Sequence, residues 1–241
     1  EYETIAIFGS KPNILTVSCE PWASLDQLKQ EKEVVGIYIS GHPLDEFNLP
    51  MEHFCNASLE VLKDLKPLVN KELRIGGIVG EVEHRISKNG KGWARFSLED
   101  YLESYDFRIF GEEYLKFKHF LFENNFIHMR LIVKEGWRDR ETGKTGDPRI
   151  NFLSFQQLQD TFSNNAKKLT LQLDINDFNE DKAESLKELF GKHKGEHQLE
   201  FSFFENNEKI KLTMLSQNHK IDINEELILS IKEKKLHFKL N

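Results

Sequence analysis

Apolar and polar residues alternate along most of residues 71–160, which is typical of strands with one buried face. The pattern predicts strands near residues 73–79, 93–98, 105–109, 127–133 and 150–155, with a helix over 112–122. Asn89-Gly90 predicts a two-residue type I′ turn between the first two strands, with positive φ at both residues. Three strands, a helix and two further strands is the order of an OB-fold barrel.

The rhythm changes after the polar break at residues 163–165. Alternation predicts strands near residues 169–173, 199–203, 210–214 and 236–240, with a further short strand at 221–223. Helical spacing predicts helices near residues 183–190 and 227–231. This order indicates a small α+β sandwich, with the ferredoxin-like arrangement as a candidate.

Residues 1–70 follow neither pattern and carry more acidic than basic side chains. Ser24 begins a capping box, a broken apolar stripe predicts a helix over 29–39, and Gly41 and Pro43 are expected to end it. We therefore expect a mixed β and α+β fold in three parts. These are a helical leader at 1–70, an OB-fold barrel at 71–160 and an α+β domain at 166–241.

Composition narrows the class of protein. A formal net charge of −7 argues against a uniformly basic nucleic-acid-binding protein but allows a local basic surface. No apolar run approaches the ~18 residues of a membrane helix, so we expect no membrane association and a cytoplasmic location. Cys19 and Cys55 are expected to be reduced thiols or one optional bridge. Because the chain begins with Glu1, we expect a piece of a longer protein.

Catalytic and metal-binding motifs are absent from the sequence. It contains no glycine-rich phosphate loop, no CxxC pair and no HExxH motif. Glu99 and Asp100 are adjacent acids at an expected turn, where a solvated bend is a simpler interpretation than paired catalytic carboxylates. The sequence thus makes no case for a self-contained enzyme, and it suggests no cofactor.

A basic and aromatic surface is the strongest functional signal. The segment from Arg85 through Arg95 contains four basic residues and no acid. Trp93 and Arg95 share one strand face because side chains alternate, and Arg108 is expected on the same face of the next strand. OB folds bind single strands on this face and its two adjacent loops, through base stacking and phosphate contacts. The alternative is that Trp93 packs beneath the leader helix and the cations only solubilise.

The candidate nucleic-acid-binding residues follow from that geometry. They are Arg85, Lys88, Lys91, Trp93, Arg95, Arg108, Trp137, Arg138, Arg140, Lys144 and Arg149.

Residues 31–45, EKEVVGIYISGHPLD, resemble the EKEVLGxYxxGHPLD stretch of the alpha subunit of bacterial DNA polymerase III. KNGK at 88–91 followed by FSLED at 96–100 matches the family's KNGKxMAxxxLED, with Trp93 in place of Met. FGEEY at 110–114 resembles its FPExY. The resemblance covers essentially the whole chain, but it is weak after residue 160.

The resemblance implies the C-terminal region of a replicative polymerase without its palm, where the family's catalytic carboxylates and their Mg²⁺ are expected. In this family the OB domain contacts single-stranded template, and the C-terminal domain binds the tau form of the clamp-loader subunit. A clamp-binding peptide QxxLF precedes the 31–45 helix. Here Ile5, Ile7 and Phe8 are the candidate clamp-binding residues, Thr4 departs from Gln, and a short apolar strand is the alternative.

Two other functions fit the same features. One is an OB-fold RNA-binding module, which comparable affinity for RNA and single-stranded DNA would favour. The other is a structural scaffold that binds no nucleic acid.

Overall fold

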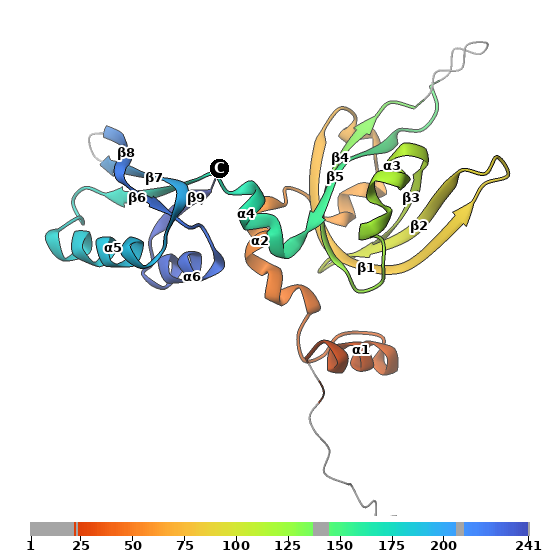
Figure 1. The fold of residues 1–241 in the computed structure, drawn as a ribbon, viewed down its shortest axis with the longest axis horizontal. Helices are drawn as coiled ribbons and strands as arrows, with labels where there is room; N and C mark the ends of the chain where they lie inside the picture. The colour runs from red at the N-terminus through yellow and green to blue at the C-terminus, as the bar shows by residue number, and fades with distance from the viewer. Residues whose placement is uncertain (1–21, 23, 137–144, 206–209, 241) are drawn as a thin grey trace, which may run out of the picture. The chain divides into compact units, whose positions relative to one another are not determined.

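The structure is a computed structural model that describes residues 22, 24–136, 145–205 and 210–240. Its contacts divide the chain into two compact units, residues 1–43 and 44–241. The second unit contains a five-stranded and a four-stranded sheet (Figure 1).

The first unit contains helix α1, Ser24–Val35. Gly36 ends it by adopting φ +85°, which glycine reaches without a Cβ clash, and its N–H donates to the Lys32 carbonyl at 2.8 Å. The prediction that this helix continues to residue 39 and stops at Gly41 is wrong for that reason. Beyond Gly36 the chain folds back, and the Glu31 carboxylate accepts the N–H groups of residues 39 and 40 at 3.0 and 2.8 Å.

Short helices form the rest of the predicted leader, between α1 and the first sheet. They are the 3-10 helix η1 (Pro43–Phe47), α2 (Asn48–Phe54), and the 3-10 helices η2 (Leu59–Lys63) and η3 (Lys66–Leu68). Leu59 and Leu62 belong to the core of the five-stranded sheet, whereas Leu49 and Phe54 belong to the core of the four-stranded sheet. The predicted leader segment therefore contributes to both hydrophobic cores.

The five-stranded sheet has the order β3-β2-β1-β4-β5 and is antiparallel throughout. Its strands are β1 (Glu72–Ile86), β2 (Gly92–Glu99), β3 (Ser104–Phe110), β4 (Phe126–Lys134) and β5 (Arg149–Gln157). Helix α3 (Gly111–Phe117) and the 3-10 helix η4 (Lys118–Phe120) separate β3 from β4. Among the described residues β3 and β5 are not paired with each other, so the barrel is partly open.

The inward positions of β2 explain the barrel core. Ala94, Phe96 and Leu98 are fully buried, whereas Trp93, Arg95 and Ser97 point to the outside of the sheet. The alternation predicted from the sequence is therefore confirmed. The outward side chains of β1, β2 and β3 together form one surface of the sheet, which we call the outer face.

The turn between β1 and β2 differs from the prediction. Only Gly90 has positive φ (+74°); Asn89 does not. The Ser87 N–H donates to the Lys91 carbonyl and the Gly90 N–H to the Ser87 carbonyl, at 2.8 and 2.9 Å. A three-residue loop with glycine in the left-handed position thus replaces the two-residue type I′ turn.

The C-terminal sheet has the order β8-β7-β6-β9. After the 3-10 helix η5 (Leu158–Asp160) and α4 (Thr161–Asn165), the elements are β6 (Lys168–Asp174), α5 (Glu180–Lys192), β7 (Lys194–Glu205), β8 (Ile210–Ile221), α6 (Glu225–Glu233) and β9 (His237–Leu240). Side chains of Asn179 and Asn224 cap the two long helices by accepting backbone N–H groups at 2.9 Å.

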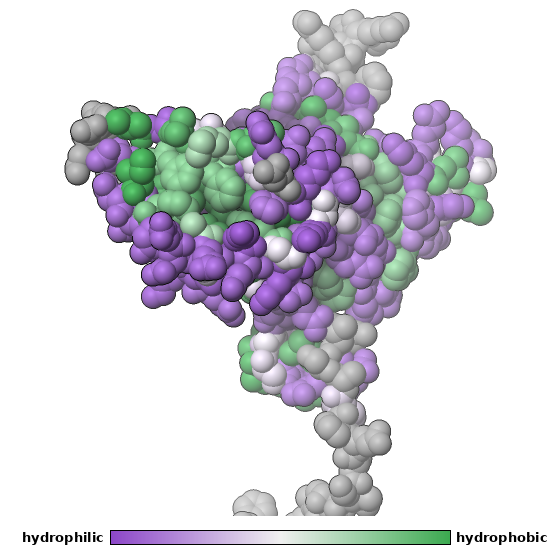
Figure 2. All heavy atoms as spheres, turned by 60° about the vertical axis from the view of Figure 1, so that its left-hand side comes forward, coloured by the Kyte–Doolittle hydropathy of each residue, from purple (hydrophilic) through white to green (hydrophobic). Residues whose placement is uncertain are grey.

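The predicted α+β sandwich is confirmed, with α5 and α6 on one side of the sheet (Figure 1). The ferredoxin-like arrangement is wrong, because β6 and β7 are parallel neighbours and no strand separates them. Ile221 ends β8 rather than beginning a separate strand. Along β8, Ile210, Leu212 and Met214 are each about half exposed, which contributes to the apolar surface of this part of the chain (Figure 2).

Candidate nucleic-acid interface

Strand pairing builds an aromatic row across the outer face. Trp93 in β2 is the Cα partner of Arg85 in β1 and of Phe110 in β3. The Trp93 and Phe110 rings stack, with centroids 5.3 Å apart and planes 21° apart, and the Arg85 guanidinium lies 5.7 Å from the Trp93 ring centroid. Phe110 is 55% exposed and Trp93 is half-buried. The row therefore offers an open aromatic surface beside a cation, which is the arrangement on which unpaired bases stack.

A second row carries charge on the same face. Arg95 is the Cα partner of Glu83 in β1 and of Arg108 in β3. Glu83 pairs with Arg85 at 2.6 Å, and Asp106 pairs with Arg95 at 2.6 Å. The hydrogen bond that the Arg95 guanidinium donates to the Asp106 carboxylate raises the pKa of Arg95 above its ordinary value. The acid-free run of the sequence therefore does not form an acid-free surface.

Arg108 differs from its neighbours on the outer face. Among the described residues it makes no ion pair, and its side chain is exposed. The two lysines of the β1–β2 loop, Lys88 and Lys91, are exposed as well. These three cations can bind phosphates without first breaking an ion pair with a carboxylate.

A cleft of about 570 Å³ runs between β3 and the start of β5, and we call it the β3–β5 cleft. Three of the predicted residues, Arg95, Arg108 and Arg149, line it. Its walls also include the aromatic side chains of Tyr105, Phe107, Phe110 and Phe152, together with Leu65, Asp106, Glu113, Pro148, Ile150 and Asn151. The cleft brings cations from three strands to one place.

Glu113 closes part of the cleft wall. Its carboxylate accepts the Phe152 N–H at 3.1 Å, so a side chain replaces the carbonyl that a neighbouring strand would supply. Burial raises the pKa of Glu113, against smaller lowering effects of the Phe152 N–H and of Arg149.

The remaining predicted residues lie outside the described residues. These are Trp137, Arg138, Arg140 and Lys144 of the second loop, and Ile5, Ile7 and Phe8 of the candidate clamp peptide. Two contributors were missed by the sequence analysis. Phe110 continues the outward positions of Asp106 and Arg108 with period two, so the alternation could have identified it. Asn151 carried no comparable signal, since its position at the cleft depends on how β5 approaches β3.

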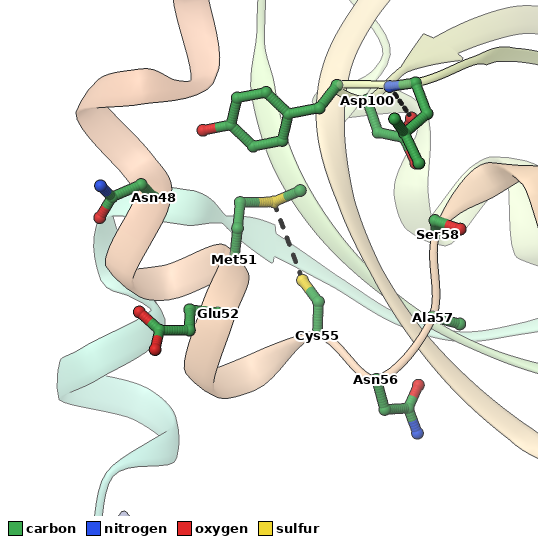
Figure 3. A pocket seen from close by; sticks show the side chains of 10 residues that line it. Asn48, Met51, Glu52, Cys55, Asn56, Ala57, Ser58 and Asp100 are labelled. Carbon is green, nitrogen blue, oxygen red and sulfur yellow. Dashed lines mark hydrogen bonds between the residues drawn. The ribbon is translucent and has the colours of Figure 1, made fainter.

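A second hollow of about 470 Å³ lies between α2 and the β2–β3 turn and carries no sign of catalysis (Figure 3). Burial raises the pKa of Cys55 to about 12, and its Sγ lies 3.9 Å from the Met51 Sδ, so this thiol is inert at neutral pH. The prediction of a solvated bend is wrong for Asp100, which is buried. Its carboxylate accepts the N–H groups of Leu59, Leu102 and Glu103. Its role is to fix the turn.

The described part of the chain has neither a metal-binding cluster nor a membrane-spanning helix. They contain no group of three or more His, Cys, Asp or Glu side chains that could hold a metal ion. None of their helices is long and apolar enough to cross a membrane.

Comparison with known proteins identifies similar chains. Residues 169–241 match the family model of the DNA polymerase III alpha subunit, C-terminal domain. DNA polymerase III subunit alpha of Mycobacterium tuberculosis (strain CDC 1551 / Oshkosh) is 23% identical over 229 residues, which are 93% of this chain and 18% of that protein. The corresponding subunit of Borreliella burgdorferi is 35% identical over 98 residues, covering 40% of this chain and 8% of that protein. The chain thus spans less than a fifth of the length of these relatives.

Similarity to solved structures is low. A small single-stranded DNA-binding protein from Streptomyces coelicolor aligns with 36% of this chain and 94% of its own, at 15% identity and a TM-score of 0.20. A score of this size supports no argument about the fold.

Proposed function

The chain is related to the C-terminal region of bacterial DNA polymerase III alpha subunits, and on this premise we propose that it is a non-catalytic part of a replicative polymerase that binds single-stranded DNA. The observation that carries the proposal is the stacked pair of Trp93 and Phe110 on the outer face, with Arg85 beside it. An exposed aromatic pair next to cations suits bases that are not stacked in a duplex.

Nucleotidyl transfer is proposed to lie elsewhere in the longer relatives. Polymerase chemistry uses Mg²⁺ held by carboxylates, and the described residues offer no cluster that could hold a metal ion. The chain is therefore proposed to position DNA rather than to join nucleotides.

Two protein partners complete the proposal. The segment with Ile5, Ile7 and Phe8 is proposed to bind the sliding clamp, and residues 166–241 are proposed to bind the tau-type clamp-loader subunit. Their support is the family resemblance. Phe8→Ala in the full chain should weaken clamp binding, and deletion of residues 166–241 should abolish capture of cognate tau. If binding is unchanged after one of these changes, the corresponding partner is rejected.

The test of DNA binding is fluorescence anisotropy of a labelled oligothymidine titrated with the full chain. Phe110→Ala should lower the affinity by roughly 1–3 kcal/mol, the contribution of one stacked base. Phe122→Ala is a matched control, since Phe122 is 52% exposed and lies outside the outer face. Equal affinity of the two variants would reject the outer face as the binding surface. Absence of any binding at low salt would leave the scaffold alternative, and equal affinity for an oligouridine would favour the RNA-binding alternative.

A further inference from the structure

The β3–β5 cleft has the dimensions of a small-molecule site. Strands β3 and β5, which are not paired with each other among the described residues, border it, and its volume of about 570 Å³ lies within the range of roughly 300–1,000 Å³ that is typical of ligand pockets. A flat track for phosphates would not need such a depth. The cleft is therefore large enough to hold one nucleotide unit.

Its inner wall combines apolar surface with few polar groups. Phe107 and Phe152 are buried there, and the Tyr105 ring packs on Phe107 with centroids 4.7 Å apart. The Tyr105 hydroxyl makes no hydrogen bond among the described residues, and burial raises its pKa. The Tyr105 hydroxyl therefore keeps hydrogen-bonding capacity that an occupant of the cleft can use.

Charge decides which part of a nucleotide fits inside. Arg95, Arg108 and Arg149 line the cleft, and because Arg95 is paired with Asp106, Arg108 and Arg149 are the cations that attract phosphates there. The Glu113 carboxylate, bonded to the backbone of β5, disfavours a second anion within the cleft. The neutral base is therefore the better occupant of the interior, with its flanking phosphates at the arginines.

We propose that the β3–β5 cleft receives one unstacked base of the bound strand and that the Tyr105 hydroxyl hydrogen-bonds to it. This inference rests on the proposed binding of single-stranded DNA. It goes further by giving one base of the strand a binding site that differs from the open stacking row of Trp93 and Phe110.

The test combines a conservative variant with abasic substitution. Tyr105→Phe keeps the ring and removes only the hydroxyl, so it should weaken binding of an oligothymidine roughly threefold to tenfold, the range expected for one hydrogen bond. The salt dependence should not change, because no phosphate contact is lost. Tyr101→Phe is the matched control, since the Tyr101 hydroxyl donates to the Leu44 carbonyl at 2.7 Å and lies outside the cleft.

An abasic residue is then placed at each position of the oligothymidine in turn. At one position the abasic residue should weaken binding to the wild-type chain but add little to the effect of Tyr105→Phe. The reason is that each change removes one partner of the same hydrogen bond. Additive effects at every position, or unchanged affinity of Tyr105→Phe, would overturn the base site. If Phe110→Ala still weakens binding in that case, the proposed function stands. If the wild-type chain binds no oligonucleotide, both proposals fail.

Discussion

Replacing Asp106 with Asn should strengthen the binding of single-stranded DNA. Asp106 pairs with the Arg95 guanidinium at 2.6 Å, and each side chain is about half exposed. A phosphate that approaches Arg95 must displace this carboxylate, which also repels it. Asn has nearly the same shape and offers only a neutral hydrogen bond, so Asp106→Asn frees one cation without leaving a void.

The magnitude follows from counterion release. Each phosphate that a protein neutralises on a single strand steepens the slope of log affinity against log salt by ~0.7. Freeing Arg95 should therefore steepen the slope by up to ~0.7. Over a fourfold rise in salt concentration, that change costs the variant about 2.6-fold more affinity than the wild type loses. The advantage of Asp106→Asn should accordingly be largest at low salt.

The assay is anisotropy of a labelled oligothymidine at several salt concentrations. Glu188→Gln is the control, because it removes one exposed negative charge from α5. The reasoning is refuted if Asp106→Asn shows the affinity and salt slope of Glu188→Gln, since Arg95 would then not meet a phosphate.

Three further predictions concern stability and reactivity. The pKa of Glu31 is lowered to about 2, chiefly by its hydrogen bond from the Ser40 hydroxyl, so its stabilising effect is present above pH 4.5 and is lost as the pH falls through about 2. Amide exchange of the loop after α1 should accelerate over that range in the wild type, and a Glu31→Gln chain that keeps this pH dependence would contradict the assignment. Gly77→Ala should destabilise the barrel by about 1–3 kcal/mol in urea unfolding, because its Cβ would lie 2.6 Å from a backbone oxygen of β2, whereas Gly191→Ala meets no atom within 4 Å and should be neutral or stabilising. Cys55 is partly exposed but its pKa is raised to about 12, so it should react slowly with a thiol reagent at pH 8 in the native chain and much faster in urea; equally rapid labelling with and without urea would contradict this.

Much of the fold could be predicted from the sequence because it depends on local periodicity. The alternation around Phe96 fixed which side chains of β2 face inward, and the five barrel strands followed from the same signal. The end of α1 was missed because two glycines competed as stop signals, and Gly36 comes first. The resemblance to DNA polymerase III alpha subunits is confirmed, and the family model matches residues 169–241, where the sequence offered no sharp motif.

The electrostatics of the site could not be predicted in the same way. Glu83 and Asp106 stand well apart from Arg95 in the chain, and only the pairing register of β1, β2 and β3 brings all three together. Periodicity assigns a side chain to a face, but it does not say which residue of the next strand lies opposite. The order of strands in the C-terminal sheet, β8-β7-β6-β9, could not be predicted from the sequence for the same reason, since βαββαβ is compatible with several pairings.

One edge of the C-terminal sheet has a consequence for handling the protein. Strand β8 ends the sheet, its outer row of backbone groups pairs with no other described strand, and Ile210, Leu212 and Met214 are half exposed along it. Edges of this kind recruit further strands, and exposed apolar side chains strengthen the contact. The exposed Lys211 on the same strand opposes this by repelling its counterpart in a second copy, and salt weakens that repulsion. Concentrated stocks in high salt should therefore self-associate first, and dilute, low-salt storage should keep the chain monodisperse.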